Sequence, residues 1–395
     1  MTERDPAAKP AIQTALIHHP YRPPAAFEAP QPGVFKASTI YFATTAAMRA
    51  RDWKSKAGYT YGLHGTPTTF TLEERIATLE GGAHSVLVPS GLAAIALTDM
   101  ALLKSGDEVL IPDNAYGPGK ELARQELARW GITHRFYDPL DANALAAMVT
   151  PATRLVWLEA PGSVTMEFPD LPNLVRAARS HGARVALDNT WGSGIAFNAF
   201  DLGVDVSAHA LTKYPSGGGD VLMGAVTTRD PALHLAMSAA HMRMGWGVAA
   251  NDAETVLRAL PSLPLRYAAH DRAARTLARW WAGRPEVAQV LHPALESSPG
   301  HAHWAALCTQ AAGLFSVVFD ARYSAAQVDA FVDALRLFKI GFSWAGPVSL
   351  VVPYDIRSMR AKPTWPGALV RFSVGLEAVD DLIADSEQAL KKLAA

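Results

Sequence analysis

The sequence is poor in cysteine, in net charge and in long apolar runs. Cys308 is its single cysteine, which excludes an internal disulfide framework and a CxxC metal site, and its apolar neighbours predict a buried core thiol. The formal net charge is −1 and no basic tract occurs, so we expect neither a nucleic-acid partner nor binding to an anionic membrane. No apolar run could span a bilayer and the first residues lack the apolar core of a secretory signal, so a cytoplasmic location is expected.

The composition is that of a globular protein, with 49% hydrophobic residues in a chain of 395. Residues 1–60, rich in proline and alanine, are expected to form an arm that lies over the body of the protein or over a neighbouring subunit. Residues 61–260 and 261–395 are expected to form a larger and a smaller α/β domain, with the boundary at Pro261 and Pro264.

Short apolar strands alternate with helices in the larger domain, which predicts a mostly parallel sheet covered on both faces. The expected strands are residues 85–88, 108–111, 154–158 and 184–187, and the expected helices are residues 91–103, 120–130 and 171–181. In the smaller domain we expect helices at residues 268–281, 325–335 and 377–393, and strands at residues 313–319 and 369–374. Parallel sheets bind their ligands beyond the carboxyl ends of the strands.

Lys213 lies among apolar residues just before a glycine-rich loop, in Ser207-Ala-His-Ala-Leu-Thr-Lys-Tyr-Pro-Ser-Gly-Gly-Gly-Asp220. Burial disfavours the ammonium ion and lowers its pKa, which turns the side chain into a nucleophilic amine. Such amines form Schiff bases with carbonyl compounds, including the aldehyde of pyridoxal phosphate (PLP). The alternative is a lysine whose stem packs while its charged head reaches water.

Two further groups that PLP would need follow expected strands. Gly91, in Pro89-Ser-Gly-Leu-Ala93, opens a helix whose free N–H groups could bind a phosphate, although a plain strand-to-helix turn has the same pattern. Asp188 closes an expected strand and could pair with a protonated pyridine nitrogen, or it could be an N-cap or turn acid.

Two other side chains suit the cofactor ring and the substrate. Tyr116, after another strand, could stack on a planar cofactor and serve in proton transfer, and its alternative is a half-buried loop tyrosine. Arg371, inside an apolar strand, requires an anion, which could be a substrate carboxylate or a structural Asp or Glu. Phosphate-binding, ring-nitrogen, stacking and Schiff-base groups thus fall at successive loops of one sheet.

From about residue 34 to the C-terminus, the chain resembles the Cys/Met-metabolism family of PLP-dependent enzymes. The signature region is Asp205-Val-Ser-Ala-His-Ala-Leu-Thr-Lys-Tyr214, in which the family's Thr-Lys-Tyr is intact. The resemblance implies the aspartate aminotransferase-like α/β fold (fold type I), with a large mostly parallel sheet domain and a smaller C-terminal α/β domain. It also implies PLP as the cofactor, an amino-acid substrate, and a homodimer or homotetramer with shared active sites.

The resemblance implies a role for each of these residues. Lys213 would carry PLP as a Schiff base and act in catalysis with Tyr116, and Asp188 would pair with the pyridine nitrogen. The groups implied for the phosphate are those of Gly91, Leu92, Thr212 and, reaching to the neighbouring subunit, Tyr61. The groups implied for the substrate carboxylate are those of Ser343, Trp344 and Arg371.

Two segments resemble the cystathionine β-lyase branch of the family. Glu159-Ala-Pro-Gly-Ser163 resembles its Glu-Ser-Pro-Gly-Ser, and Phe342-Ser-Trp-Ala-Gly346 resembles its Tyr-Ser-Trp-Gly-Gly. At the position of Phe342, γ-specific members usually carry a glutamate. The expected reaction is carbon–sulfur β-elimination, in which cystathionine and water give homocysteine, pyruvate and ammonia. Alternatives on the same scaffold are γ-lyase, γ-synthase or cysteine desulfhydrase activity, and outside catalysis a PLP-fold regulator.

Several positions depart from the family pattern. Leu63 stands where many members have a phosphate-binding arginine, which His64 could replace unless it is an ordinary loop histidine. Ala210 replaces a common serine, and Gly218 and Gly219 replace a frequent His-Ser pair. These changes concern the anchoring of the phosphate rather than the chemistry.

Overall fold

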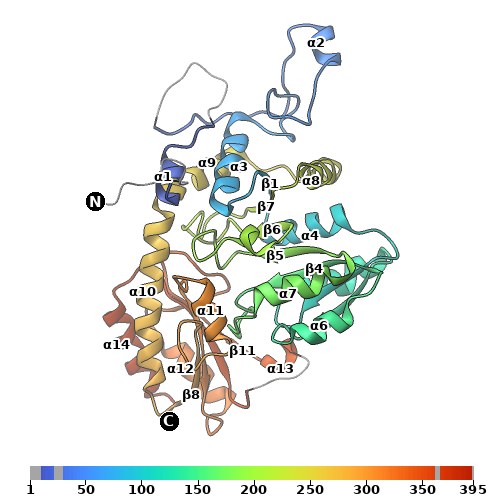
Figure 1. Ribbon diagram of the computed structural model, residues 1–395. Coiled ribbons are helices and arrows are strands. Elements are labelled where there is room, and N and C mark those ends of the chain that lie inside the picture. The colour runs from blue at the N-terminus through green and yellow to red at the C-terminus, as the bar shows by residue number, and fades with distance from the viewer. Residues whose placement is uncertain (1–9, 22–29, 361–364, 394–395) are drawn as a thin grey trace, which may run out of the picture.

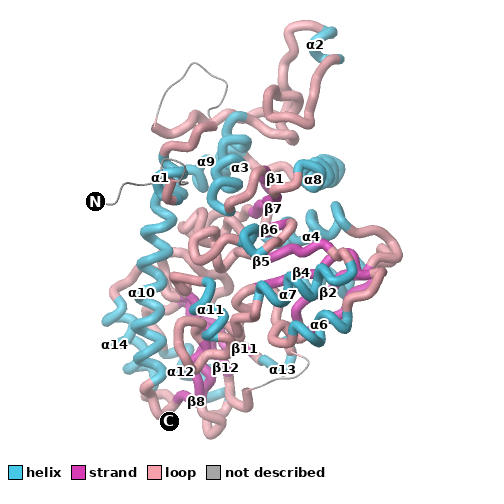
Figure 2. The backbone as a smooth tube through the Cα atoms, in the orientation of Figure 1, coloured by secondary structure: helices cyan, strands magenta, loops and turns pink. Residues whose placement is uncertain are grey.

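A seven-stranded sheet forms the scaffold of the larger part of the molecule (Figure 1, Figure 2). The computed structural model describes residues 10–21, 30–360 and 365–393. All strands of this sheet except β7 run in the same direction, which confirms the predicted mostly parallel sheet. In spatial order they are β1 (His84–Val88), β7 (Gly224–Thr228), β6 (Val206–His209), β5 (Arg184–Asp188), β4 (Thr153–Glu159), β2 (Glu108–Pro112) and β3 (Thr133–Tyr137).

Helices cover both faces of this sheet because alternate residues of its central strands are apolar on both sides. In β4, Val156 and Leu158 pack in one core cluster and Leu155 and Trp157 in the other. The first cluster includes side chains of α3 (Pro67–Glu80), α6 (Ala142–Met148) and α7 (Leu171–Ala178). The second includes side chains of α4 (Gly91–Leu102), the π-helical segment η1 (Ala123–Leu127) and α8 (Pro231–Met244).

The predicted helices of the larger domain are present, and one of them begins earlier than expected. Helix α4 matches residues 91–103, and α7 with the 3₁₀ turn η2 (Arg179–His181) matches residues 171–181. The helix expected at residues 120–130 begins earlier, as α5 (Gly117–Leu122), and continues into η1. Pro118 favours this start because proline is tolerated in the first turn of a helix.

A five-stranded sheet lies in the C-terminal part of the chain. Its spatial order is β10 (Lys339–Ile340), β11 (Leu350–Tyr354), β12 (Leu369–Ser373), β9 (Leu314–Phe319) and β8 (Val287–Leu291). The helices of this part are α10 (Leu263–Ala282), α11 (His301–Leu307), α12 (Ala325–Ala334), α13 (Ile356–Met359) and α14 (Val379–Leu390). Cys308 is buried, as predicted, and burial raises the pKa of its thiol to about 12. The predicted strands at residues 313–319 and 369–374 are confirmed as β9 and β12.

The expected boundary at Pro261 and Pro264 is helical rather than a loop. Helix α9 (Ala250–Ala259) leads through the 3₁₀ turn η4 (Leu260–Ser262) directly into α10, which begins five residues before the expected residue 268. Both prolines stand in first turns, where a missing N–H costs no helical hydrogen bond. The domain limits at residues 60/61 and 260/261 stay a prediction.

The N-terminal arm contacts α3 at several points, through Lys56 and Phe35 among others, and one short helix of the arm reaches into the core. Leu16 of α1 (Ile12–Ile17) is fully buried in the core cluster that contains Leu72 and Ile76 of α3. The segment around α2 (Thr45–Arg49) extends away from the rest of the chain at the top of Figure 1. Residues 1–9 and 22–29 of the arm lie outside the described residues. Within the described ranges, no helix combines the length and hydropathy that crossing a membrane requires.

Replacing Trp281 by alanine should destabilise the C-terminal core. Trp281 is fully buried, and its ring lies 5.9, 5.7 and 5.5 Å from the rings of Phe319, Phe331 and Phe372. We expect the free energy of unfolding to fall by about 3–5 kcal/mol, because the loss of a buried aromatic ring leaves a cavity. Trp130→Ala is the control, since Trp130 is 44% exposed. Similar losses for the two variants in urea unfolding would contradict this assignment.

Candidate active site

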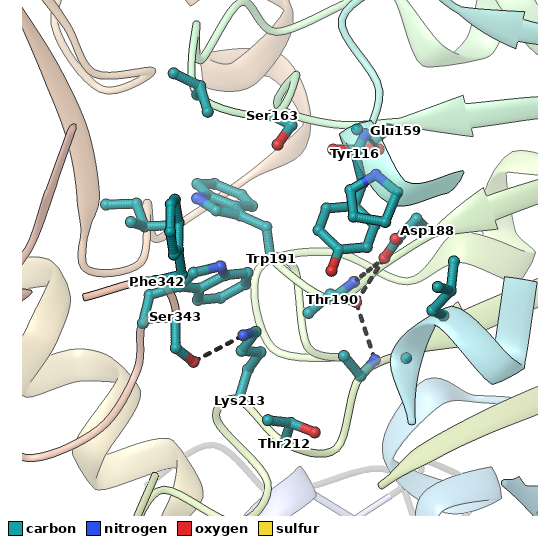
Figure 3. Close-up of a pocket in the computed structure, with 18 of the residues that line it drawn as sticks. Tyr116, Glu159, Ser163, Asp188, Thr190, Trp191, Thr212, Lys213, Phe342 and Ser343 are labelled. Carbon is teal, nitrogen blue, oxygen red and sulfur yellow. Dashed lines mark hydrogen bonds between the residues drawn. The ribbon is translucent and has the colours of Figure 1, made fainter. Parts of the chain in front are cut away.

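A pocket of about 590 Å³ opens at the carboxyl ends of β4 and β5, where side chains from both sheets meet (Figure 3). Parallel sheets place ligands at this edge. Nine of the ten predicted site residues line it, namely Gly91, Leu92, Tyr116, Asp188, Thr212, Lys213, Ser343, Trp344 and Arg371. The pocket therefore brings together residues that are up to 280 positions apart, from Gly91 to Arg371.

The amine of Lys213 points into the pocket from the loop after β6 (Figure 3). Its Nζ donates a hydrogen bond to Ser343 Oγ at 2.8 Å and lies 5.5 Å from the centre of the Trp344 ring. Burial, and then the charge of Arg371, lower the pKa of Lys213 to about 8, although Asp188 acts in the opposite direction. A lowered pKa is the property that a nucleophilic amine requires.

The loop that carries Ser343 has a strained backbone. Ser343 has φ +121° and Ala345 has φ +69°, both in the left-handed region that non-glycine residues rarely adopt. Arg371 Nη2 donates to the Ser343 carbonyl at 3.3 Å, while the Ser343 hydroxyl accepts from Lys213. The two cations of the pocket thus hold this strained loop from both sides. Strain of this kind concentrates at functional sites.

Asp188, the last residue of β5, presents a carboxylate to the pocket. Its Oδ1 accepts hydrogen bonds from the Thr190 N–H at 3.0 Å and from the Thr190 hydroxyl at 2.5 Å, which fixes the orientation of the group. Burial raises the pKa of Asp188, and the bonds from Thr190 oppose that rise. One carboxylate edge is held by the protein, so the other is available to a ligand cation.

Helix α4 begins at the pocket and offers free N–H groups there. The Ser90 hydroxyl caps the helix by accepting from the Ala93 N–H at 3.1 Å, and Gly91 and Leu92 line the pocket before it. A Cβ atom on Gly91 would lie 2.5 Å from Cβ of Ala210, so only glycine allows this close approach. The first turn of a helix binds phosphate through such groups.

Arg371 is buried and lacks a carboxylate partner among the described residues. Its side chain comes from β12, its guanidinium lies 5.2 Å from the centre of the Tyr354 ring, and its Nε has no hydrogen-bond partner in the part of the chain that the structure describes. Within the described ranges, the structural salt bridge that was the alternative for Arg371 is therefore absent. A buried guanidinium with an unpartnered N–H suits the carboxylate of a bound amino acid.

Glu159 is a pocket residue that the sequence analysis did not assign. It ends β4 beside Asp188 of β5, and its Oε2 accepts a hydrogen bond from the Tyr116 N–H at 2.8 Å. Burial, and then the neighbouring Asp188, raise the pKa of Glu159 well above its usual range. Glu159 therefore anchors the Tyr116 loop as a group that resists ionisation. Its place at the end of an apolar strand could have identified it as a site residue from the sequence.

The remaining predicted positions lie near the pocket or beyond it. Tyr61 is 48% exposed and does not line the pocket, so its role toward a neighbouring subunit stays a prediction. The Thr212 hydroxyl bonds both backbone groups of Met223, which leaves its phosphate role a prediction as well. His64 bonds the Thr60 hydroxyl and is absent from the pocket wall. Gly219 has φ +77°, which explains why glycine stands there.

Comparison with known proteins identifies the family. A model of the Cys/Met metabolism PLP-dependent enzyme family matches residues 13–391. The chain belongs to this family. A cystathionine beta-lyase of Bordetella avium is 41% identical over 366 residues, which cover 91% of each chain. A cystathionine beta-lyase of Salmonella typhimurium is 37% identical over 358 residues, which cover 89% of this chain and 90% of that one.

Solved structures agree with the family assignment. The crystal structure of metB from Corynebacterium glutamicum matches with a TM-score of 0.89 and 28% identity, covering 97% of this chain and 98% of that one. The predicted fold type I architecture is confirmed. As a member of the Cys/Met metabolism family, the chain is a PLP-dependent enzyme, so the predicted cofactor is also confirmed.

The pocket fits PLP on structural grounds. The start of α4, where a Cβ on Gly91 has no room, suits the phosphate, and the open edge of Asp188 suits the ring nitrogen. Among the described residues, the Lys213 amine has only the Ser343 hydroxyl as a hydrogen-bond partner, and it suits the aldehyde carbon. The phosphate, the ring and the aldehyde of PLP would thus each find a group of matching chemistry in this one cavity.

The pKa of Lys213 should be measurable in the cofactor-free protein. We expect acylation of its amine to rise with pH around a midpoint of about 8, because only the neutral amine reacts. Arg371→Gln should move this midpoint upward, since a positive neighbour disfavours the ammonium ion. Mass spectrometry of the modified peptide gives the rate at each pH. A midpoint near 10.5, the ordinary lysine value, would contradict the burial argument.

Proposed function

We propose that the chain is a carbon–sulfur β-lyase that converts cystathionine and water to homocysteine, pyruvate and ammonia. The observation that carries the proposal is the contact between Lys213 and the loop Phe342-Ser-Trp-Ala-Gly346. This contact places a proton-carrying amine against the segment that resembles the β-lyase branch. Phe342 lines the pocket with an apolar ring, where γ-specific members carry a glutamate. The cystathionine beta-lyases of two bacteria, similar along nine-tenths of the chain, support the same reaction.

Arg371 would bind the carboxylate of the substrate. Its buried, unpartnered Nε and its Nη2 can form two parallel bonds to a carboxylate, and Ser343 and Trp344 border the same space. Tyr116 would orient the substrate amine or accept its proton, because its hydroxyl points into the pocket (Figure 3). The substrate's Cα would then lie within reach of the Lys213 amine.

Lys213 would move the protons of the reaction. Its pKa of about 8 leaves part of the amine neutral at neutral pH, so it can take the proton from Cα and later deliver one to the departing sulfur. The Ser343 hydroxyl would hold the amine in place between the two transfers. PLP, when bound, supplies the electron sink for this chemistry. Asp188 would keep a proton on the ring nitrogen through its fixed carboxylate.

Product analysis tests the reaction. The purified enzyme should release pyruvate from cystathionine, and Lys213→Ala should lower the rate by at least about 10³-fold, because the same side chain binds the cofactor and moves the proton. Lys104→Ala is the matched control, since the Lys104 side chain is 77% exposed and far from the pocket. Release of 2-oxobutyrate would show γ-elimination instead, and no turnover of cystathionine would exclude the proposed substrate.

We also propose that the active site is shared in a homodimer or homotetramer, within the cytoplasm. Tyr61 is exposed and outside its own pocket, which supports a role in the pocket of a second copy. Mixing inactive Lys213→Ala and Tyr61→Ala proteins should restore roughly a quarter of the activity, because half of the random dimers are mixed and each contains one complete site.

A matched mixture separates shared sites from simple stabilisation. Lys213→Ala mixed with Arg371→Ala should stay inactive, since both residues line the same pocket of one chain. Equal recovery in the two mixtures, or none in the first, would contradict the shared site.

A further inference from the structure

A buried ion cluster lies beside the pocket and takes no part in the mechanism above. Arg360 Nη1 donates to Glu167 Oε1 at 2.7 Å and to the Thr165 hydroxyl at 3.3 Å, and Arg360 Nη2 lies 3.0 Å from Asp113 Oδ1. The side chains of Arg360 and Glu167 are only 9% and 4% exposed. Burial alone would lower the pKa of Arg360, but the two carboxylates raise it. The cluster is thus a charged arginine held by two acids.

The cluster joins parts of the chain that are distant in sequence. Arg360 directly follows α13 in the C-terminal part, whereas Asp113 directly follows β2 in the large sheet. A second cation repeats the link, because Lys120 Nζ donates to the carbonyls of Asp113 at 2.7 Å and of Met359 at 2.8 Å. The C-terminal segment and the large sheet are therefore joined through backbone carbonyls as well as through side chains.

Both segments that this link joins contribute residues that line the pocket. Met359 and Tyr354 line the pocket on the C-terminal side, and Tyr354 lies against the guanidinium of Arg371 at 5.2 Å. Tyr116 lines it on the other side, three residues after Asp113. Between them, Asn114 Nδ2 donates to Glu167 Oε2 at 3.0 Å, so the Tyr116 loop is bonded to the same cluster.

We infer that Arg360 is a positioning residue that sets the affinity of the pocket for an amino-acid carboxylate. Its ion pairs hold residues 354–359 against the Tyr116 loop, and Tyr354 in turn holds the guanidinium of Arg371 in its carboxylate-binding position. Arg360 itself does not line the pocket. The inference rests on the proposed role of Arg371 but not on which bond of the substrate is cleaved.

The binding of L-alanine to the holoenzyme tests this role, with the visible absorbance of the cofactor as the readout. Arg360→Met should weaken alanine binding by on the order of tenfold, because the uncharged side chain releases both carboxylates. Arg360→Lys should weaken it less, since the ammonium retains one partner. The cofactor content should stay that of the wild type. With cystathionine, KM should rise more than kcat falls.

Two further variants keep the test decisive. Glu167→Gln removes one carboxylate while preserving shape, and it should weaken alanine binding in the same direction if Arg360→Met fails to fold. Arg275→Met is the matched control, because it breaks a partly buried ion pair with Asp271 away from the pocket. Unchanged alanine binding in Arg360→Met and Glu167→Gln, or an equal loss in Arg275→Met, would overturn the inference. Failure of the wild type to release pyruvate would instead refute only the proposed reaction.

Discussion

An amine buried beside a guanidinium loses its proton more readily than one in water, and the pocket holds Lys213 in such a place. Burial and Arg371 together bring its pKa to about 8, against the weaker opposing effect of Asp188. Two neighbouring features of the site act directly on this amine. The strained Ser343 loop receives the amine, and Arg371 both lowers the pKa of Lys213 and presents a free N–H to the pocket. The proposed chemistry needs this one desolvated base.

Two carboxyl groups at the ends of neighbouring strands have different roles because their hydrogen-bond partners differ. Asp188 and Glu159 face each other in register across β5 and β4, and burial raises the pKa of both. Thr190 stabilises the charged form of Asp188 with two hydrogen bonds, which suits a partner for a cationic ring. Glu159 instead holds the Tyr116 loop through a backbone N–H, a task that requires no charge.

Elements that a local residue pattern specifies could be predicted from the sequence. Strands β2, β4 and β5 are continuous apolar runs. Asp188 ends a strand, Gly91 begins a helix, and Lys213 lies in the loop after β6. Strand β11 was not predicted from the sequence, because Pro353 argues against a strand there. Only Leu350 and Val351 of β11 pair with β10, so Pro353 lies beyond the end of that pairing and its missing N–H costs no hydrogen bond to β10. Tyr354 and the Arg360 cluster depend on that strand, so only the folded chain brings them to the pocket.

The proposed chemistry requires that Lys213 be the amine that carries the cofactor. Reduction of the PLP-loaded enzyme with borohydride fixes the cofactor to whichever amine holds it, and peptide mapping by mass spectrometry then identifies the residue. The structure predicts a single labelled peptide that contains Lys213, because this amine alone among the lysines lines the pocket in the described residues. A label on another lysine, or no label on an active enzyme, would contradict the account.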